Sequence, residues 1–185
     1  MRSGRVPSCR HVACLTLAGL AVLFAAARPA PAASQMPDAA ADMGRTVVAL
    51  DVKAAHSKFA PDAEAVLFAL INECRAGHHV PPVVMSALLR NVAREHSREM
   101  ALEGFAGHGS PLGQSFLGRV SRVIPPGRFV GENVTVAVTV EDANRAFTAS
   151  AGHLENILDP RFHSVGIGVA SAESLGYTIT EDFSQ

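Results

Sequence analysis

Apolar residues recur every three or four positions along two stretches of the chain, which is typical of helices with one buried face. The first stretch follows Pro61-Asp62 and ends at Gly77, residues that suit the start and the end of a helix. The second follows Ser86, a good capping residue, and ends at Gly104. The sequence therefore predicts two helices in this region. Their predicted buried positions are Val66, Leu67, Leu70, Ile71 and Cys74, then Leu88, Leu89, Val92, Ala93, His96 and Met100.

Two shorter patterns follow along the chain. Residues 115–123 have the pattern of a short amphipathic helix, which the sequence PPG at 125–127 then breaks. A third helix is predicted from Thr139, because Thr139 and Asp142 have the spacing of a capping box. Phe147 is its expected buried anchor. In the 115–123 segment the apolar side carries Phe116, Leu117 and Val120, and the polar side carries Arg119 and Arg122.

The pattern changes near the end of the chain, where two short runs favour strands. Residues 165–169 and 177–180 are rich in β-branched residues and are separated by a loop that contains Gly176. Two such runs with a short connection predict an antiparallel pair. Helices packed on both sides of this small sheet would give an α+β fold, a three-layer α-β-α sandwich. We expect this domain to occupy residues 61–185.

The first 33 residues have the pattern of a secretory signal peptide. Arginines precede an uncharged apolar run at 12–27, and small residues follow in an Ala-x-Ala setting near Ala32. The run is shorter than the roughly 20 residues that cross a bilayer, so we expect no membrane span after cleavage. The protein would be secreted or periplasmic. Residues 34–60 show no sustained period and are expected to form a linker or a loosely ordered arm.

Removal of this segment changes the charge and the cysteine content. The chain of 185 residues has 16 basic and 17 acidic residues, and four arginines leave with the signal peptide. The remaining 12 basic residues against 17 acidic ones give a net charge of −5. A role in nucleic-acid binding is therefore not expected. Cys74 is the one cysteine after residue 33, and we expect it to be a buried apolar residue.

Three later segments place a polar side chain beside glycine. They are "FAGHGSPLG" with His108, "VGENV" with Glu132 and "SAGHLENIL" with His153. Glycine permits close approach of a ligand, and two imidazoles with a carboxylate match the ligand set of catalytic zinc sites. The spacing fits no local zinc motif, so three separate structural roles remain the alternative. His96, on an apolar stripe, is expected to be a hydrogen-bonded core residue.

Five blocks of sequence resemble the bacterial branch of the CAP superfamily, also called the SCP-like extracellular domain. The blocks are "LINECRAG", "AREHSREMALEGFAGHGSPLG", "GENV", "SAGHLENILDPRFHSVGIGV" and "YTITEDF". The resemblance implies an α-β-α sandwich in which His108, Glu132 and His153 meet in a central cleft. Ser150 stands where many eukaryotic relatives have a second glutamate, so their four-ligand set is absent. Ser150 and Asn133 are the other candidate cleft residues.

Three functions remain open at this point. The resemblance favours a binding module whose cleft takes an apolar or lipid ligand or a divalent metal such as Zn²⁺. The alternative enzyme is a metal-dependent hydrolase, with His108 and His153 holding zinc and Glu132 as third ligand or general base. No arrangement typical of a covalent nucleophile is evident. The third function is interaction with an envelope or surface protein, with the polar loops purely structural.

Overall fold

A computed structural model describes residues 47–50, 54–111, 113–172 and 176–185. The expected signal peptide, residues 1–33, lies outside the described residues. Within the described ranges, no helix combines the length and the apolar character needed to cross a membrane.

A five-stranded sheet forms the middle of the fold. Four of its strands follow the order β2-β6-β7-β5, so β5 is an outer strand, and β3 pairs with β6 beyond this path. The pair β6-β7 is antiparallel, as the two β-type runs predict, and only β3 pairs in parallel. The strands are β2 (Ser57–Phe59), β3 (Val84–Met85), β5 (Val130–Ala137), β6 (Ser164–Ala172) and β7 (Gly176–Ser184). A separate two-stranded sheet joins β1 (Val47–Ala49) to β4 (Phe105–Gly107).

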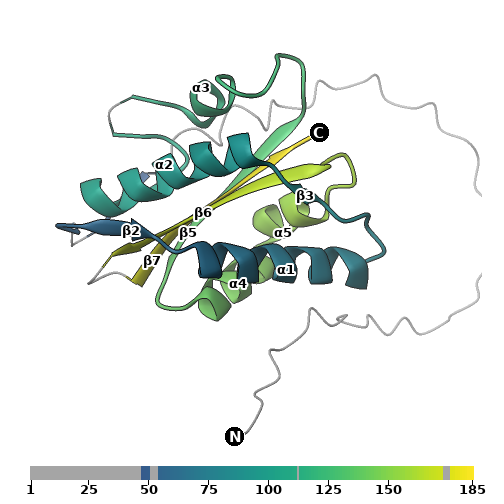
Figure 1. Ribbon diagram of the computed structural model, residues 1–185, viewed down its shortest axis with the longest axis horizontal. Helices are drawn as coiled ribbons and strands as arrows, with labels where there is room; N and C mark the ends of the chain where they lie inside the picture. Colours follow the sequence, from purple (N-terminus) through teal and green to yellow (C-terminus); the bar gives the residue numbers. More distant parts are fainter. Residues whose placement is uncertain (1–46, 51–53, 112, 173–175) are drawn as a thin grey trace, which may run out of the picture.

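Helices cover both faces of the large sheet (Figure 1). On one face lie α2 (Ala87–Glu103) and the short α3 (Phe116–Val120). On the other lie α1 (Pro61–Gly77), α4 (Val140–Ala149) and α5 (Ala151–Leu158). The architecture is therefore α+β with three layers, as expected.

Capping groups fix where these helices begin and end. The Ser86 hydroxyl accepts a hydrogen bond from the Leu89 backbone N–H at 3.3 Å, and α2 ends at Gly104 with φ of 67°. The Thr139 hydroxyl accepts from the Asp142 N–H at 3.1 Å and starts α4. These start and end signals are confirmed.

The face of the sheet under α2 is packed almost against the helix backbone. A Cβ atom added to Gly166 would lie 2.1 Å from the Leu89 carbonyl carbon, and one added to Gly168 would lie 2.3 Å from that of Ala93. Two glycines on one face of β6 thus allow α2 to approach the strand more closely than any side chain would permit. This contact fixes the position of α2 and of the polar residues on it.

The opposite face carries the main hydrophobic core, in which α1 packs against α4, α5 and the sheet. Leu67, Ile71 and Cys74 are buried there, as the periodicity predicts. The prediction of Val66 as a core position is wrong, because 43% of Val66 is exposed. The buried face of α1 includes Glu64 in its place. Leu88 is likewise 60% exposed at the start of α2.

Arg75 is a buried charge on this same face that the sequence did not single out. Its side chain is fully buried and donates hydrogen bonds to four backbone carbonyls, those of Pro81, Ile157, Asp159 and Phe162. Burial lowers the pKa of the guanidinium, and the nearby Asp159 opposes that effect. Arg75 therefore fastens the end of α1 to the end of α5.

The segment expected as a linker or loosely ordered arm contributes strands to the fold. β1 pairs with β4 and β2 pairs with β6, both antiparallel. Both strands are three residues long, which is too short for alternation to reveal them. β1 also places a partner beside β4, the strand that leads directly into His108.

Candidate functional site

Glu132 is the centre of a polar cluster on the outer strand β5. Its carboxylate is fully buried and accepts hydrogen bonds from two side chains elsewhere in the chain, those of His108 and Arg119. The His108 ring donates from Nδ1 to Oε1 at 2.9 Å, and Arg119 donates from Nη2 to Oε2 at 2.5 Å. Both carboxylate oxygens are therefore engaged. We call His108, Glu132 and His153 the histidine cluster.

His108 reaches Glu132 from the residue directly after β4. Its side chain is 18% exposed, so the ring is held at Nδ1 while one edge remains accessible to solvent. A carboxylate that accepts from Nδ1 fixes the tautomer and orientation of the imidazole. Nε2 is then the nitrogen of His108 that would meet a ligand.

His153 approaches the same region from the first turn of α5. Burial lowers the pKa of its imidazole, and the charge of nearby His108 lowers it further. The ring packs edge-on against Phe147 with centroids 5.3 Å apart, and Phe147 is buried as predicted. Within the described part of the chain, Nδ1 of His153 is buried without a hydrogen-bond partner. The ring is therefore neutral at pH 7, and its neighbourhood contains His108.

Asn133 holds the backbone of His153 in place. Its amide donates to the His153 carbonyl at 3.1 Å and to Glu181 Oε2 at 3.0 Å. Asn156 of α5 donates in turn to Asn133 Oδ1 at 2.9 Å. Neighbouring positions on β5 point to opposite faces of the sheet. The Glu132 side chain therefore lies on the face of the sheet that α2 and α3 cover, and the Asn133 side chain lies on the face that α5 covers. The histidine cluster thus receives contributions from both faces at the outer strand.

Ser150 lies at the junction of α4 and α5 and is half-buried. Its backbone N–H donates to the Ala146 carbonyl at 3.2 Å, and its side chain makes no capping hydrogen bond with α5. Glu155, two residues after His153, is exposed. No second carboxylate therefore joins His108 and His153 from this helix.

Two charged residues of the site were not identified from the sequence. Arg119 was placed on the polar side of its segment, but that is wrong, because only 1% of Arg119 is exposed and it binds Glu132. Asp182 on β7 is the register partner of Glu132 and is also buried. Burial raises the pKa of Asp182 well above its usual range, and the charge of Glu132 adds to this. A neutral Asp182 beside an ionised Glu132 is the arrangement that results.

Metal coordination by the cluster would rely on the two histidines. Among the residues that the structure describes, no group of three His, Cys, Asp or Glu side chains is placed to hold a metal ion. The two oxygens of Glu132 accept from His108 and Arg119, so Glu132 orients one of the two histidines.

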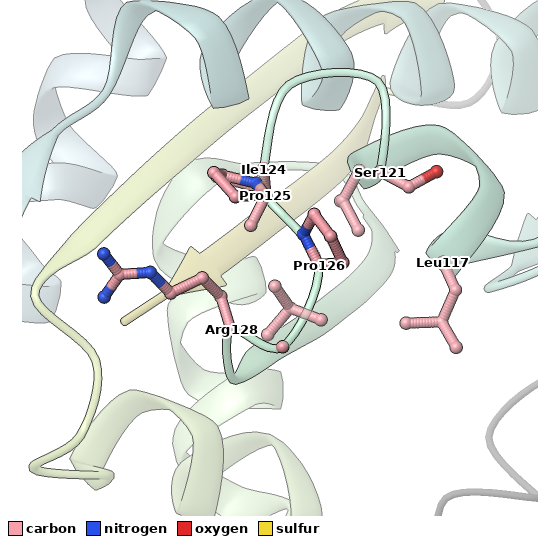
Figure 2. A pocket seen from close by; sticks show the side chains of 9 residues that line it. Leu117, Ser121, Ile124, Pro125, Pro126 and Arg128 are labelled. Carbon is pink, nitrogen blue, oxygen red and sulfur yellow. The ribbon is translucent and has the colours of Figure 1, made fainter.

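Two pockets lie beside α3, on the α2 side of the sheet. One has a volume of about 150 Å³ and is mainly apolar; Figure 2 shows Leu117 of α3 and Pro125 and Pro126 of the following loop lining it. The other has a volume of about 320 Å³ and is lined entirely by polar side chains. Its lining residues are Glu95, His96, Glu99, Gln114, Arg119 and Arg122. We call it the arginine pocket.

Comparisons with known proteins identify a family that this chain matches. A model of the CAP family, described as the cysteine-rich secretory protein family, matches residues 68–183. No curated protein matches the chain.

Three solved bacterial structures share the fold. An extracellular protein containing an SCP domain from Bacillus anthracis is 25% identical, with a TM-score of 0.59 over 66% of this chain and 40% of that one. An outer surface protein from Borrelia burgdorferi is 14% identical, with a TM-score of 0.62 over 70% and 97%. A cysteine-rich secretory protein from Staphylococcus aureus is 16% identical, with a TM-score of 0.53 over 67% and 38%. The chain thus spans less than half the length of the Bacillus and Staphylococcus proteins.

Proposed function

The chain belongs to the CAP family, the cysteine-rich secretory proteins, and on this premise we propose that it is an exported binding module that holds a divalent metal ion at His108 and His153. The resemblance of residues 1–33 to a signal peptide supports export. So do the descriptions of the Bacillus protein as extracellular and of the Borrelia protein as an outer surface protein.

The hydrogen bond between His108 and Glu132 is the observation that carries the metal assignment. Histidines that bind metals almost always donate their other ring N–H to a carboxylate or carbonyl group. His108 has this partner, and the lowered pKa of His153 keeps the second imidazole neutral, as metal binding requires. Zn²⁺ suits imidazole ligands and would keep positions open for water or for a donor atom of a ligand.

The same hydrogen bonds argue for binding and against hydrolysis. A general base must be free to take a proton from water. Glu132 is fully buried, and its two oxygens accept from His108 and Arg119. The geometry therefore supports a positioning role for Glu132 and a binding function for the cluster.

Zinc titration calorimetry on the EDTA-treated protein tests this proposal. We expect one Zn²⁺ per chain, with affinity reduced at least about tenfold in His108→Ala and in His153→Ala, and about 10–100-fold in Glu132→Gln. His163→Ala is the matched control, because it makes the same change at an exposed histidine that is not a member of the cluster. Affinity should fall below about pH 6, where histidine takes up a proton. Absence of zinc binding, or equal affinity in the control and the cluster variants, would overturn the proposal.

The apolar pocket supports a second candidate, the binding of a small apolar ligand. Its volume of about 150 Å³ resembles that of a cavity that holds a single benzene ring, so it suits a ring or a short alkyl group and not a whole sterol. Leu117→Gln should weaken the binding of a short-chain fatty acid. Leu88→Gln is the control, because both leucines are 60% exposed and only Leu117 lines the pocket. Equal binding by the two variants would remove this candidate.

A further inference from the structure

The arginine pocket is the feature that the proposed function leaves unexplained. It lies between α2 and α3, and Glu95, His96 and Glu99 line it from successive turns of α2. Gln114, Arg119 and Arg122 line it from α3 and its flanking residues. Its volume of about 320 Å³ is within the range of small-molecule sites. The pocket is thus large enough for a compact polar ligand.

Arg119 brings unused hydrogen-bond donors to this pocket. Only 1% of the residue is exposed, and Nη2 is bound to Glu132. Within the described residues, its Nε and Nη1 atoms have no hydrogen-bond partner. A buried guanidinium nitrogen without an acceptor is unfavourable, and a carboxylate or a phosphate group can supply one. The arginine therefore favours a ligand with an anionic group.

The same pocket also carries negative charge. The neighbouring His96 ring, and to a lesser extent the Ser110 hydroxyl, holds the pKa of Glu99 below its usual range, so Glu99 is ionised at pH 7. Glu95 forms a rim pair with Arg122 at 3.3 Å. Two carboxylates would repel a dianion, and two guanidinium groups would repel a metal cation. The pocket therefore matches a molecule that carries both charges.

The Glu99 carboxylate indicates where the positive group of such a molecule would lie. It lines the pocket from α2, and the Ser110 hydroxyl donates to its Oε1. Its Oε2 lies 3.5 Å from Nδ1 of His96, whose Nε2 bonds to the Gly107 carbonyl at 2.8 Å. An ammonium group, with three donors, could pair with this carboxylate.

We propose that the arginine pocket binds a small zwitterion, an α-amino acid or a dipeptide, with its carboxylate on Arg119 and its ammonium on Glu99. The exposed side chain of Gln114 lies at the rim, and Arg122 adds a second positive charge to the lining, which attracts the carboxylate. This site is separate from the metal site of the proposed function.

Calorimetry and amide NMR titrations of the full mature chain, in EDTA, test the proposal apart from any metal binding. The probes are L-alanine, L-alanyl-L-alanine, N-acetyl-L-alanine and L-alanine amide. We expect one of the two zwitterions to bind, with shifts at His96 and Gly107, and the blocked compounds to bind at least about tenfold more weakly. The zwitterion that binds more tightly identifies the source as a free amino acid or a peptide.

Two variants with matched controls complete the test. Glu99→Gln and Arg122→Gln should each weaken zwitterion binding about tenfold, and neither contacts the histidine cluster. Glu73→Gln and Arg128→Gln make the same chemical changes at exposed positions outside the pocket and should bind normally. The proposal is overturned if neither zwitterion binds at about 10 mM. It is also overturned if N-acetyl-L-alanine binds as tightly as alanine, or if Glu99→Gln binds as the wild type does.

Discussion

Glu181 should make the stability of this protein depend strongly on pH. The side chain lies on β7 with only 1% of its surface exposed, and it accepts one hydrogen bond, from Asn133. Burial raises the pKa of Glu181 to about 8, although the bond from Asn133 acts in the opposite direction. Within the described residues Oε1 has no partner, and no cation is paired with the carboxyl group. The folded protein therefore carries a neutral Glu181 at pH 7.

The magnitude follows from the difference between the folded and unfolded states. In the unfolded chain the carboxyl group has its ordinary pKa of 4.5, so it loses its proton at a much lower pH than in the fold. Between pH 4.5 and 8 the folded state binds more protons than the unfolded state, and stability falls as the pH rises. The full loss is about 5 kcal/mol, of which about 3 kcal/mol occurs by pH 7. Such a loss is a large fraction of the stability of a typical domain.

Glu181→Gln removes this pH dependence while keeping the shape of the side chain and an oxygen for Asn133. Urea denaturation at pH 4.5, 6, 7 and 8 measures the free energy of unfolding of both proteins. The value for the variant minus that for the wild type should rise by about 3 kcal/mol between pH 4.5 and 7. Glu73→Gln, the same change at an exposed carboxylate of α1, should follow the wild type throughout. Parallel curves for wild type and Glu181→Gln would refute the reasoning, as would a carboxyl NMR titration of Glu181 near pH 4.5.

Three further predictions concern the fold. Arg75→Met should lower the free energy of unfolding by at least about 3 kcal/mol in urea, because four carbonyls lose their donor; a loss below about 1 kcal/mol would contradict this. Gly168→Ala should cost about 3 kcal/mol or prevent folding, whereas Gly152→Ala, with open space around its Cβ, should leave the melting temperature nearly unchanged. Thr139→Ala should cost only about 1 kcal/mol by removing the cap of α4, and an unchanged melting temperature would show that the cap contributes nothing.

The parts of the fold that could be predicted are those in which one face is apolar and the other polar. α1, α2 and α4 have this pattern together with capping signals, and β6 and β7 have β-branched runs. β5 was missed because it carries buried polar residues on both faces, Glu132 on one and Asn133 on the other. Its pattern therefore resembles a polar loop, although the strand is central to the site.

The site itself could be predicted in part. Glycine-flanked polar residues identified His108 and Glu132, which are in contact, and His153, which lies near His108. Buried charges could not be found in the same way, because Arg119 and Asp182 look like ordinary surface residues in sequence. Their burial follows from the carboxylate of Glu132, which Arg119 binds and beside which Asp182 lies. That relation depends on strand register and on the position of α3, and neither can be read from local sequence.

Arg119 connects the histidine cluster to the arginine pocket, so ligand binding at one should affect the other. One guanidinium serves both Glu132, which orients His108, and the arginine pocket. A carboxylate that binds Arg119 would draw positive charge away from Glu132 and so strengthen its hold on the His108 proton. Occupancy of either site should then alter the affinity of the other by one common factor, because equilibrium linkage is reciprocal. Titrating alanine with and without zinc, and zinc with and without alanine, measures that factor twice, and a factor of one in both titrations would show that the two sites are not coupled.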